Sequence, residues 1–305
     1  MRKNGFLTYQ RNGEYGMKTA IIIDSTAYAN ETIRNHPDVY ELFLTATFED
    51  GTHFLDSSDI AVQEEFYKKL QESEQLPKTS QPAPGDYIKL IEEIIEKGYD
   101  QLLCIHLSQT FSGTYQTAKM LASEYEDQID ICVVDSKGVS LVMGALVEQA
   151  LDMIEKGVPF EDICKNTRWS AKHGTIYLTV SDLDNLVKGG RLNGAAAKVG
   201  GMLKIRPLLY VDADGKVEVL EKIRTDKKVN RRLAEIAVKD AESFPNGMIL
   251  KFAHAVDEER LEVAIDCVHE KLPDLDYEIG TLGPVIGTHT GTGTIGMGTI
   301  PRADY

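Results

Sequence analysis

The first half of the chain alternates between continuous apolar runs and segments whose apolar residues recur at helical spacing, and this alternation constrains the fold most. Residues 18–24 read Lys-Thr-Ala-Ile-Ile-Ile-Asp, which is typical of a strand buried on both faces. Residues 84–97 begin with proline and carry one apolar stripe, which predicts a helix that ends before Gly98. The later elements predicted in this half are a strand at 101–105, a helix at 112–126, a strand at 129–135 and a helix at 139–155. Alternation of this kind requires right-handed crossovers and a mostly parallel sheet.

Further patterns complete the predicted architecture. Residues 39–48 and 52–55 flank a Glu-Asp-Gly turn and predict a hairpin, and Asp59 is a candidate N-cap for a helix through about residue 70. The elements predicted after about residue 172 are a strand at 175–180, a Gly-rich region at 188–201, a hairpin at 208–211 and 216–223, helices at 226–243 and 258–271, and strands at 248–254 and 277–279, the last in the chain. A hairpin mixed with α/β crossovers indicates a second domain with a mixed sheet. We therefore expect an extension at 1–16, an N-terminal α/β domain at 17–170 and a C-terminal α/β domain at 171–305.

The charge balance and the hydropathy exclude several classes of partner. The 33 Lys and Arg residues against 48 Asp and Glu leave a net charge of 33 − 48 = −15, which argues against nucleic acid or an anionic membrane surface as the main partner. No apolar run is long enough to span a bilayer, and the start of the chain lacks the apolar stretch of a signal peptide. The four cysteines are scattered and the seven histidines show no metal-ligand spacing, so we expect neither disulfides nor a metal site. These features predict a cytoplasmic protein whose membrane contact is at most transient.

Hydroxyl-bearing side chains are concentrated in three predicted turns. Ser25 follows the first strand, Thr79 and Ser80 precede the proline-led helix, and residues 108–115 read Ser-Gln-Thr-Phe-Ser-Gly-Thr-Tyr. In a parallel α/β sheet, strand ends and helix starts share the edge where ligands bind, and helix N-termini there attract anions. Each hydroxyl taken singly is better explained as a helix N-cap. Three such turns at one edge nevertheless predict a pocket for a small anion.

Two basic residues lie among glycines. We expect His289, in Gly287-Thr-His-Thr-Gly291, to belong to a loop far from any helix, and Arg191 lies in the sequence Lys-Gly-Gly-Arg. Such residues are usually solvated or part of a surface turn, but glycines also let a backbone pack closely against a ligand. Residues 291–296 match the Gly-x-Gly-x-x-Gly pattern of dinucleotide sites. Only nine residues follow, too few for the helix, strand and acidic residue that this motif requires.

A serine hydrolase is the enzyme class that these residues could also form. Ser112 and His289 could meet in space as nucleophile and base. The Gly-x-Ser-x-Gly pattern that many such enzymes use is absent around Ser112. The hydrolase therefore stays open as the less favoured alternative to a binding protein.

Five short motifs occur in order along the chain: Ile23-Asp-Ser-Thr26, Thr79-Ser-Gln-Pro82, Phe111-Ser-Gly-Thr-Tyr-Gln116, Gly189-Gly-Arg-Leu192 and Gly287-Thr-His-Thr-Gly291. In this order and spacing they resemble the motifs of the DegV family of bacterial fatty-acid-binding proteins, which includes the binding subunits of the bacterial fatty acid kinase. The resemblance runs from Met17 to about Gly298. It implies a two-domain DegV-like fold, with an N-terminal three-layer α/β/α domain, a C-terminal α/β domain and the lipid between or beneath them.

The resemblance also implies roles for individual residues. The residues that match the carboxylate-binding positions are Thr79, Ser112, Gly113 and His289, and those expected at the pocket mouth, in support of phosphoryl transfer, are Arg191, Ser25 and Ser80. The two hydroxyls would hold the fatty acid carboxylate, with the histidine close to it. Thr292 departs from the family pattern, in which we expect Gly-Pro-Gly after the histidine, and this bears on the rigidity of the loop.

The function implied by the resemblance is that of a lipid-binding protein with no catalytic residue and no cofactor. It would bury the tail of a long-chain fatty acid and present the carboxylate to a separate ATP-dependent fatty acid kinase, which makes acyl phosphate for phospholipid metabolism. The chain has no Gly-x-x-x-x-Gly-Lys-[Ser/Thr] motif, so we do not expect it to hydrolyse ATP alone. A stand-alone lipid carrier or sensor is the main alternative.

Overall fold

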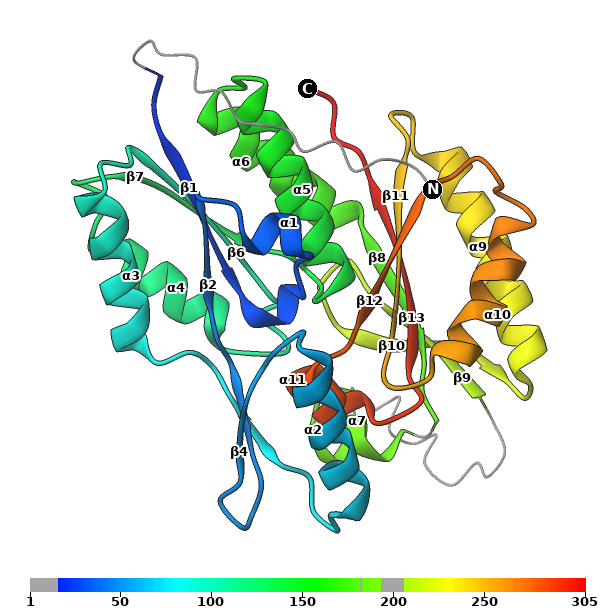
Figure 1. Ribbon diagram of the computed structural model, residues 1–305. Helices are drawn as coiled ribbons and strands as arrows, with labels where there is room; N and C mark the ends of the chain where they lie inside the picture. The colour runs from blue at the N-terminus through cyan, green and yellow to red at the C-terminus, as the bar shows by residue number, and fades with distance from the viewer. Residues whose placement is uncertain (1–15, 182, 193–205) are drawn as a thin grey trace.

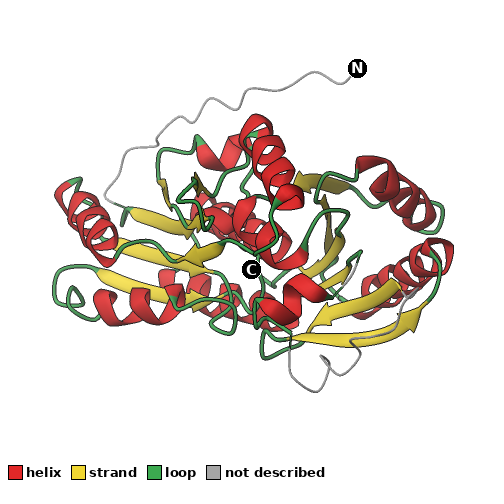
Figure 2. Ribbon diagram, turned by 90° about the horizontal axis from the view of Figure 1, so that it is seen from below, coloured by secondary structure: helices red, strands yellow, loops and turns green. Residues whose placement is uncertain are grey.

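The computed structural model describes residues 16–181, 183–192 and 206–305. Nearly all of the extension expected at 1–16, and much of the Gly-rich region expected at 188–201, lie outside the described residues. Two large sheets stand side by side with a layer of helices between them, and further helices cover their outer faces (Figures 1 and 2).

The first sheet is parallel throughout. Its strands lie in the order β2 (Val39–Leu42), β1 (Thr19–Asp24), β6 (Gln101–His106) and β7 (Asp130–Asp135). Alternate residues of β1 face different cores, since Ile21 and Ile23 belong to one buried cluster and Ala20 and Ile22 to another. The mostly parallel sheet predicted from the alternating pattern is confirmed.

Helices cover both faces of this sheet and complete three layers. α3 (Pro84–Glu96) and α4 (Thr114–Ala122) pack on the outer face, and α5 (Leu141–Glu155) and α6 (Phe160–His173) pack on the face toward the second sheet. α4 is shorter at both ends than the helix predicted at 112–126. The sequence analysis predicts no helix at 160–173, because Thr167 and Ser170 are buried on the inner side of α6 and interrupt its apolar stripe.

The second sheet is mixed, as predicted. Its six strands lie in the order β10 (Val217–Ile223), β9 (Arg206–Val211), β8 (Thr175–Thr179), β13 (Ile295–Pro301), β11 (Met248–His254) and β12 (Tyr277–Thr281). β11 and β12 are parallel and the other neighbouring pairs are antiparallel, including the predicted hairpin of β9 and β10. α9 (Asp226–Ser243) and α10 (Glu258–His269) cover the outer face, and α5 contacts β13 and β11 from the inner side.

β13 corrects the predicted end of the fold. The prediction that residues 277–279 form the last strand is wrong, because β13 follows them and lies inside the sheet, buried along its whole length. Gly296 and Gly298 make this segment look like a loop in the sequence. A Cβ atom at Gly298 would lie 2.9 Å from the Cβ of Leu141, so the glycine lets α5 pack closely against the strand.

A third sheet, small and antiparallel, lies beside α2 (Ile60–Glu72) and α11 (Pro284–Thr290). Its strands are β4 (His53–Leu55), β3 (Thr45–Thr47) and β5 (Lys78–Ser80). The hairpin predicted at 39–48 and 52–55 is only partly right, because β3 and β4 form it whereas residues 39–42 pair with β1. Asp59 caps α2 as predicted, and its side chain accepts hydrogen bonds from the first turn of that helix.

Candidate functional site

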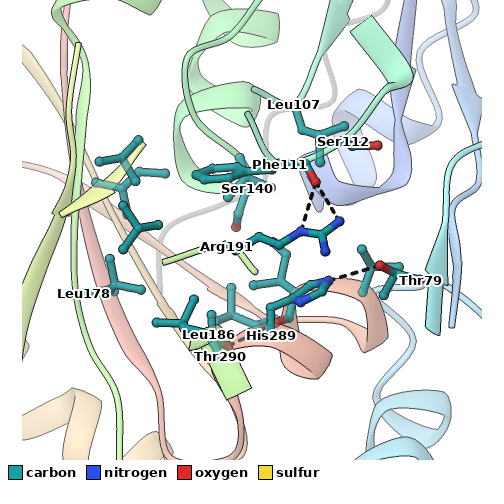
Figure 3. Close-up of a pocket in the computed structure, with 18 of the residues that line it drawn as sticks. Thr79, Leu107, Phe111, Ser112, Ser140, Leu178, Leu186, Arg191, His289 and Thr290 are labelled. Atoms are coloured by element: carbon teal, nitrogen blue, oxygen red, sulfur yellow. Dashed lines mark hydrogen bonds between the residues drawn. The ribbon is translucent and has the colours of Figure 1, made fainter. Parts of the chain in front are cut away.

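A cavity of about 420 Å³ lies where the two large sheets, the small sheet and α11 meet. Its apolar wall includes Leu107, Ile176, Leu178, Val211, Val217 and Ala253. Thr79, Arg191 and His289 lie close together at a polar end, with Ser112 and Phe111 above them in the view of Figure 3. A mostly apolar cavity with a few polar groups gathered at one end suits an amphiphilic ligand.

The cavity collects most of the residues selected from the sequence. The lining includes Thr79, Ser80, Ser112, Gly113, Arg191 and His289. Ser25 is not part of it: this side chain is buried, donates a hydrogen bond to Asp56 Oδ2 at 3.1 Å and accepts one from the N–H of Leu44 at 3.0 Å. The structure thus places Ser25 behind the lining residue Leu44 rather than at the mouth expected from the sequence.

One hydrogen bond joins the small sheet to α11 at the polar end. Thr79 on β5 places its Oγ1 atom 3.0 Å from Nε2 of His289 in the last turn of α11 (Figure 3). The expectation that His289 belongs to a loop far from any helix is therefore wrong. Pro284 at the helix start and Gly291, with φ 77° at the helix end, delimit a helix too short to show a clear periodic pattern.

The environment of His289 keeps its imidazole neutral. Burial and, to a lesser extent, the charge of Arg191 lower the pKa of His289 to about 4. The Nδ1 atom is buried and has no hydrogen-bond partner among the described residues. A Cβ atom on Gly189 would collide with Nδ1, so the glycine after α7 (Asp184–Lys188) makes room for the ring.

Arg191 adds a positive charge at the same end of the cavity. Its Nε and Nη2 atoms donate to the carbonyl oxygen of Phe111 at 3.2 and 3.0 Å (Figure 3). Its Nη1 atom donates to the carbonyl oxygen of Gly189. Burial lowers the pKa of the guanidinium. The partners shown for Arg191 are thus neutral oxygens, and an anionic ligand would supply the countercharge.

Ser112 and Gly113 form the start of α4 at the cavity edge. Ser112 Oγ accepts a hydrogen bond from the N–H of Thr114 at 3.3 Å and lies 2.9 Å from Thr114 Oγ1. Gly113 is the N-cap, and a Cβ atom there would lie only 2.5 Å from Oε1 of Gln81. The N-terminal end of α4, which carries a partial positive charge, therefore lies at the cavity edge.

Comparison with known proteins supports the resemblance seen in the motifs. The family model described as "Uncharacterised protein, DegV family" matches residues 18–302. The chain belongs to the DegV family. A DegV domain-containing protein of Listeria innocua is 35% identical over 283 residues, which are 92% of this chain and 97% of that protein.

Solved DegV structures share the fold of this DegV protein. A fatty acid binding DegV family protein from Streptococcus agalactiae superposes with a TM-score of 0.87 at 32% identity, over 94% of this chain and 100% of that one. DegV, a fatty acid binding protein from Bacillus subtilis, gives a TM-score of 0.81 at 33% identity, again over 94% of this chain and 100% of that one. DegV proteins of known structure thus include fatty acid binders.

The hydrogen bonds of this DegV protein do not form the pair that a serine hydrolase needs. The Oγ atom of Ser112 pairs with Thr114, and Nε2 of His289 pairs with Thr79. Among the described residues, no hydrogen bond therefore joins Ser112 to His289 as nucleophile and base.

Neither a metal-binding cluster nor a membrane-spanning helix is found among the described residues. Residues 16–181, 183–192 and 206–305 contain no group of three or more His, Cys, Asp or Glu side chains arranged to hold a metal ion. None of the helices in these ranges is both long and apolar enough to cross a bilayer. All four cysteines are free thiols.

Some lining groups of this site are not predicted by any pattern in the sequence. Gln81 and the carbonyl of Phe111 lie in motifs already recognised, yet nothing in the sequence indicates that they contact Gly113 and Arg191. Ser140, buried at the start of α5, has a φ of 50° that a serine rarely adopts, and no sequence pattern announces this. The path of the backbone places these groups at the cavity, and residue types alone do not predict that path.

Proposed function

We propose that this DegV protein binds a long-chain fatty acid, with the tail in the apolar part of the cavity and the carboxylate at its polar end. The observation that carries the proposal is the pairing of a largely apolar cavity of about 420 Å³ with a half-buried Arg191 that has only carbonyl partners in the described structure. The fatty acid binding of its structural relatives supports the same ligand class.

The tail supplies most of the gross binding energy. An alkyl chain of about sixteen carbons, at roughly 0.8 kcal/mol for each buried CH₂ group, gives on the order of 12 kcal/mol. Ordering of the chain and loss of overall motion take back much of this free energy. The net affinity is tight but finite, as a carrier that must release its ligand requires.

The head group takes its partners from the polar end. We assign to the neutral His289 the tautomer that donates from Nε2 to Thr79 Oγ1, which leaves the hydroxyl hydrogen of Thr79 for the carboxylate. Thr79 and Ser112 then donate hydroxyl hydrogen bonds to the carboxylate, and the N-terminus of α4 at Gly113 contributes its dipole. Arg191 balances the negative charge. We assign the exposed Ser80, which lines the cavity next to Thr79, to the pocket mouth.

The second part of the proposal is that a separate ATP-dependent fatty acid kinase acts on the bound carboxylate. A carboxylate oxygen attacks the γ-phosphorus of ATP, the bond to the β-phosphate oxygen breaks, and ADP leaves as the acyl phosphate forms. Negative charge grows at the head group during this transfer, and Arg191 and His289 stand where they can stabilise it. The catalytic machinery belongs to the partner, because the chain carries no Gly-x-x-x-x-Gly-Lys-[Ser/Thr] motif.

Two measurements test the proposal in order. Mass spectrometry of the small molecules released by denaturing the purified protein is expected to show a stoichiometric long-chain fatty acid, and its absence together with failure to bind added fatty acid contradicts the ligand class. The loaded protein is then mixed with a fatty acid kinase catalytic subunit and ATP, where acyl phosphate is expected. If the protein binds fatty acid but no kinase that it captures produces acyl phosphate, the alternative function of a stand-alone carrier or sensor is favoured.

A further inference from the structure

The buried carboxylate of Asp56 lies outside the cavity. It joins three segments around the cavity: the end of β4, the turn after β1 and the start of α11. Asp56 follows β4 and is fully buried. Its Oδ1 atom accepts hydrogen bonds from the N–H of Val285 at 2.9 Å and from the hydroxyl of Tyr28 at 3.1 Å. Its Oδ2 atom accepts one from the hydroxyl of Ser25 at 3.1 Å. Ser25 and Tyr28 belong to the turn that follows β1, and Val285 belongs to α11.

The contacts of Asp56 lead directly to the cavity wall. Val285 lies in the first turn of α11 and lines the cavity, and His289 follows it by four residues, one helical turn further on the same face. Ser25, which is bonded to the other oxygen of Asp56, accepts a hydrogen bond from the N–H of Leu44, another lining residue. The carboxylate thus connects the start of α11 with the segments that follow β1 and β2.

We infer that Asp56 is a positioning residue of the fatty acid site, which fixes the start of α11 so that His289 stays within hydrogen-bonding distance of Thr79. This inference rests on the proposed function for the identity of the ligand. It assigns to Asp56 no contact with the ligand, since the residue does not line the cavity.

Close packing around the start of α11 shows how tightly its position is determined. A Cβ atom on Gly283, the N-cap of α11, would lie 2.9 Å from Oδ1 of Asp56 and 2.7 Å from the carbonyl oxygen of Ser57. The hydroxyl of Tyr67 donates a hydrogen bond to the carbonyl oxygen of Leu282 at 2.7 Å and so also fixes the residue before Gly283. Only glycine permits this approach, so a shift of the Asp56 side chain moves the helix start with it.

The strained backbone of Tyr28 points to the same role. Tyr28 has a φ of 42°, in the left-handed region that tyrosine rarely adopts. Its hydroxyl bond to Asp56 is one of the contacts that fix it there. Residues in such conformations persist where the surroundings over-determine them, and they are frequent around binding sites.

An asparagine can keep the three contacts of Asp56 with one hydrogen bond reversed, and this makes the role testable. The amide oxygen would accept from Val285 and Tyr28, and the amide nitrogen would donate to Ser25 Oγ, which donates to Asp56 in the native protein. Burial raises the pKa of Asp56 to about 7 against the lowering effect of these donors, while Asp24, Tyr28 and Tyr67 are the titratable groups around it. A role in positioning therefore predicts that Asp56→Asn behaves like the native protein and that Asp56→Ala does not.

The experiment compares Asp56→Ala, Asp56→Asn and Asp240→Ala in the full chain. Asp240 accepts hydroxyl bonds from Tyr177 and Thr299 on the outer side of the second sheet, away from the cavity, and serves as the matched control. NMR signals of the His289 imidazole are recorded without ligand and assigned with His289→Gln, and palmitate affinity is then measured. We expect Asp56→Ala to move the His289 signals and to weaken palmitate binding roughly tenfold, a loss that Asp56→Asn reverses and Asp240→Ala does not show.

Unchanged His289 signals in Asp56→Ala, or an equal loss of affinity in Asp240→Ala, would overturn the inference. An equal loss in Asp56→Asn would assign the effect to charge and not to position, and would overturn it as well. If Asp56→Ala does not fold, Tyr28→Phe removes one of the three bonds and is expected to move the His289 signals in a folded protein. Failure of the native protein to bind palmitate refutes the proposed function alone, because the NMR comparison needs no ligand.

Discussion

The imidazole of His289 and the hydroxyl of Thr79 lie 3.0 Å apart, although 210 positions separate the two residues in the chain. The bond closes the polar end of the cavity by joining α11 to the small sheet. Both groups are neutral, because burial lowers the pKa of His289. The charge at this end of the cavity therefore comes from Arg191, and the two neutral groups would orient the carboxylate of the proposed fatty acid ligand.

Removal of either candidate hydroxyl is expected to weaken retention of the fatty acid. A hydrogen bond to a charged group contributes roughly 1.5–3 kcal/mol, so Thr79→Ala and Ser112→Ala should each raise the dissociation constant about tenfold or more. Thr79→Ser keeps the hydroxyl and is the control that should bind almost like the native protein. Titration with a fluorescent long-chain fatty acid measures the effect. Equal affinity in Thr79→Ala and Thr79→Ser would remove Thr79 from the head-group site.

Replacement of His289 is expected to affect acyl phosphorylation more than binding. Preorganised polar groups stabilise the negative charge that develops during phosphoryl transfer, and loss of one such group typically slows a reaction about 10²-fold or more. His289→Ala should slow acyl phosphate formation by this order in the presence of the kinase and ATP. Its effect on affinity for the fatty acid should be several times smaller. A parallel loss of binding and turnover would show that His289 acts only in ligand retention.

The lowered pKa of His289 predicts how stability depends on pH. The ordinary pKa of histidine is 6.5 and that of His289 in the folded protein is about 4, so between these values the unfolded chain binds the additional proton. The contribution of His289 to the free energy of unfolding is fully present above pH 6.5 and is lost as the pH falls toward 4.

A comparison with His289→Gln isolates this contribution, because other titrating groups such as Asp56 are common to both proteins. Urea denaturation at pH 7 and at pH 5 should show a larger loss of stability on acidification in the native protein than in the variant. The same loss in both proteins would mean that the imidazole is solvated and accessible to protons.

The apolar wall predicts a limit on tail length. Ala253 on β11 lines the cavity, and a leucine there would occupy space that the tail otherwise fills. Ala253→Leu should shift preference from octadecanoic toward tetradecanoic acid while the carboxylate contacts remain. Competition between the two acids, followed by mass spectrometry of the bound fraction, measures the shift. An unchanged preference would place the end of the tail elsewhere.

Periodicity and turn residues predicted much of the N-terminal sheet because local pattern and burial agree there. Residues 18–24 read as a strand buried on both faces, and β1 has that environment. The pattern failed at β13, where Gly296 and Gly298 replace the β-branched residues typical of a buried strand. Close approach of α5 explains Gly298, and only the three-dimensional structure shows that approach.

In the candidate site, too, the sequence predicts some features and only the three-dimensional structure shows the others. The motifs drew attention to Thr79, Ser112 and His289 one by one, and the cavity includes all three. Ser25 has the same hydroxyl chemistry in the same kind of turn, yet it bonds to Asp56 behind the cavity wall. Residue type and turn position select candidates, but tertiary packing decides which of them face the ligand.

A crystal structure of the protein with hexadecanoic acid that carries bromine on its last carbon would locate both ends of the ligand in the cavity. We expect carboxylate density within hydrogen-bonding distance of Thr79 Oγ1 and Ser112 Oγ, and an anomalous bromine peak in the apolar part of the cavity lined by Leu178 and Ala253. A reversed ligand, with bromine beside His289, or a fatty acid bound outside the cavity would contradict this expectation.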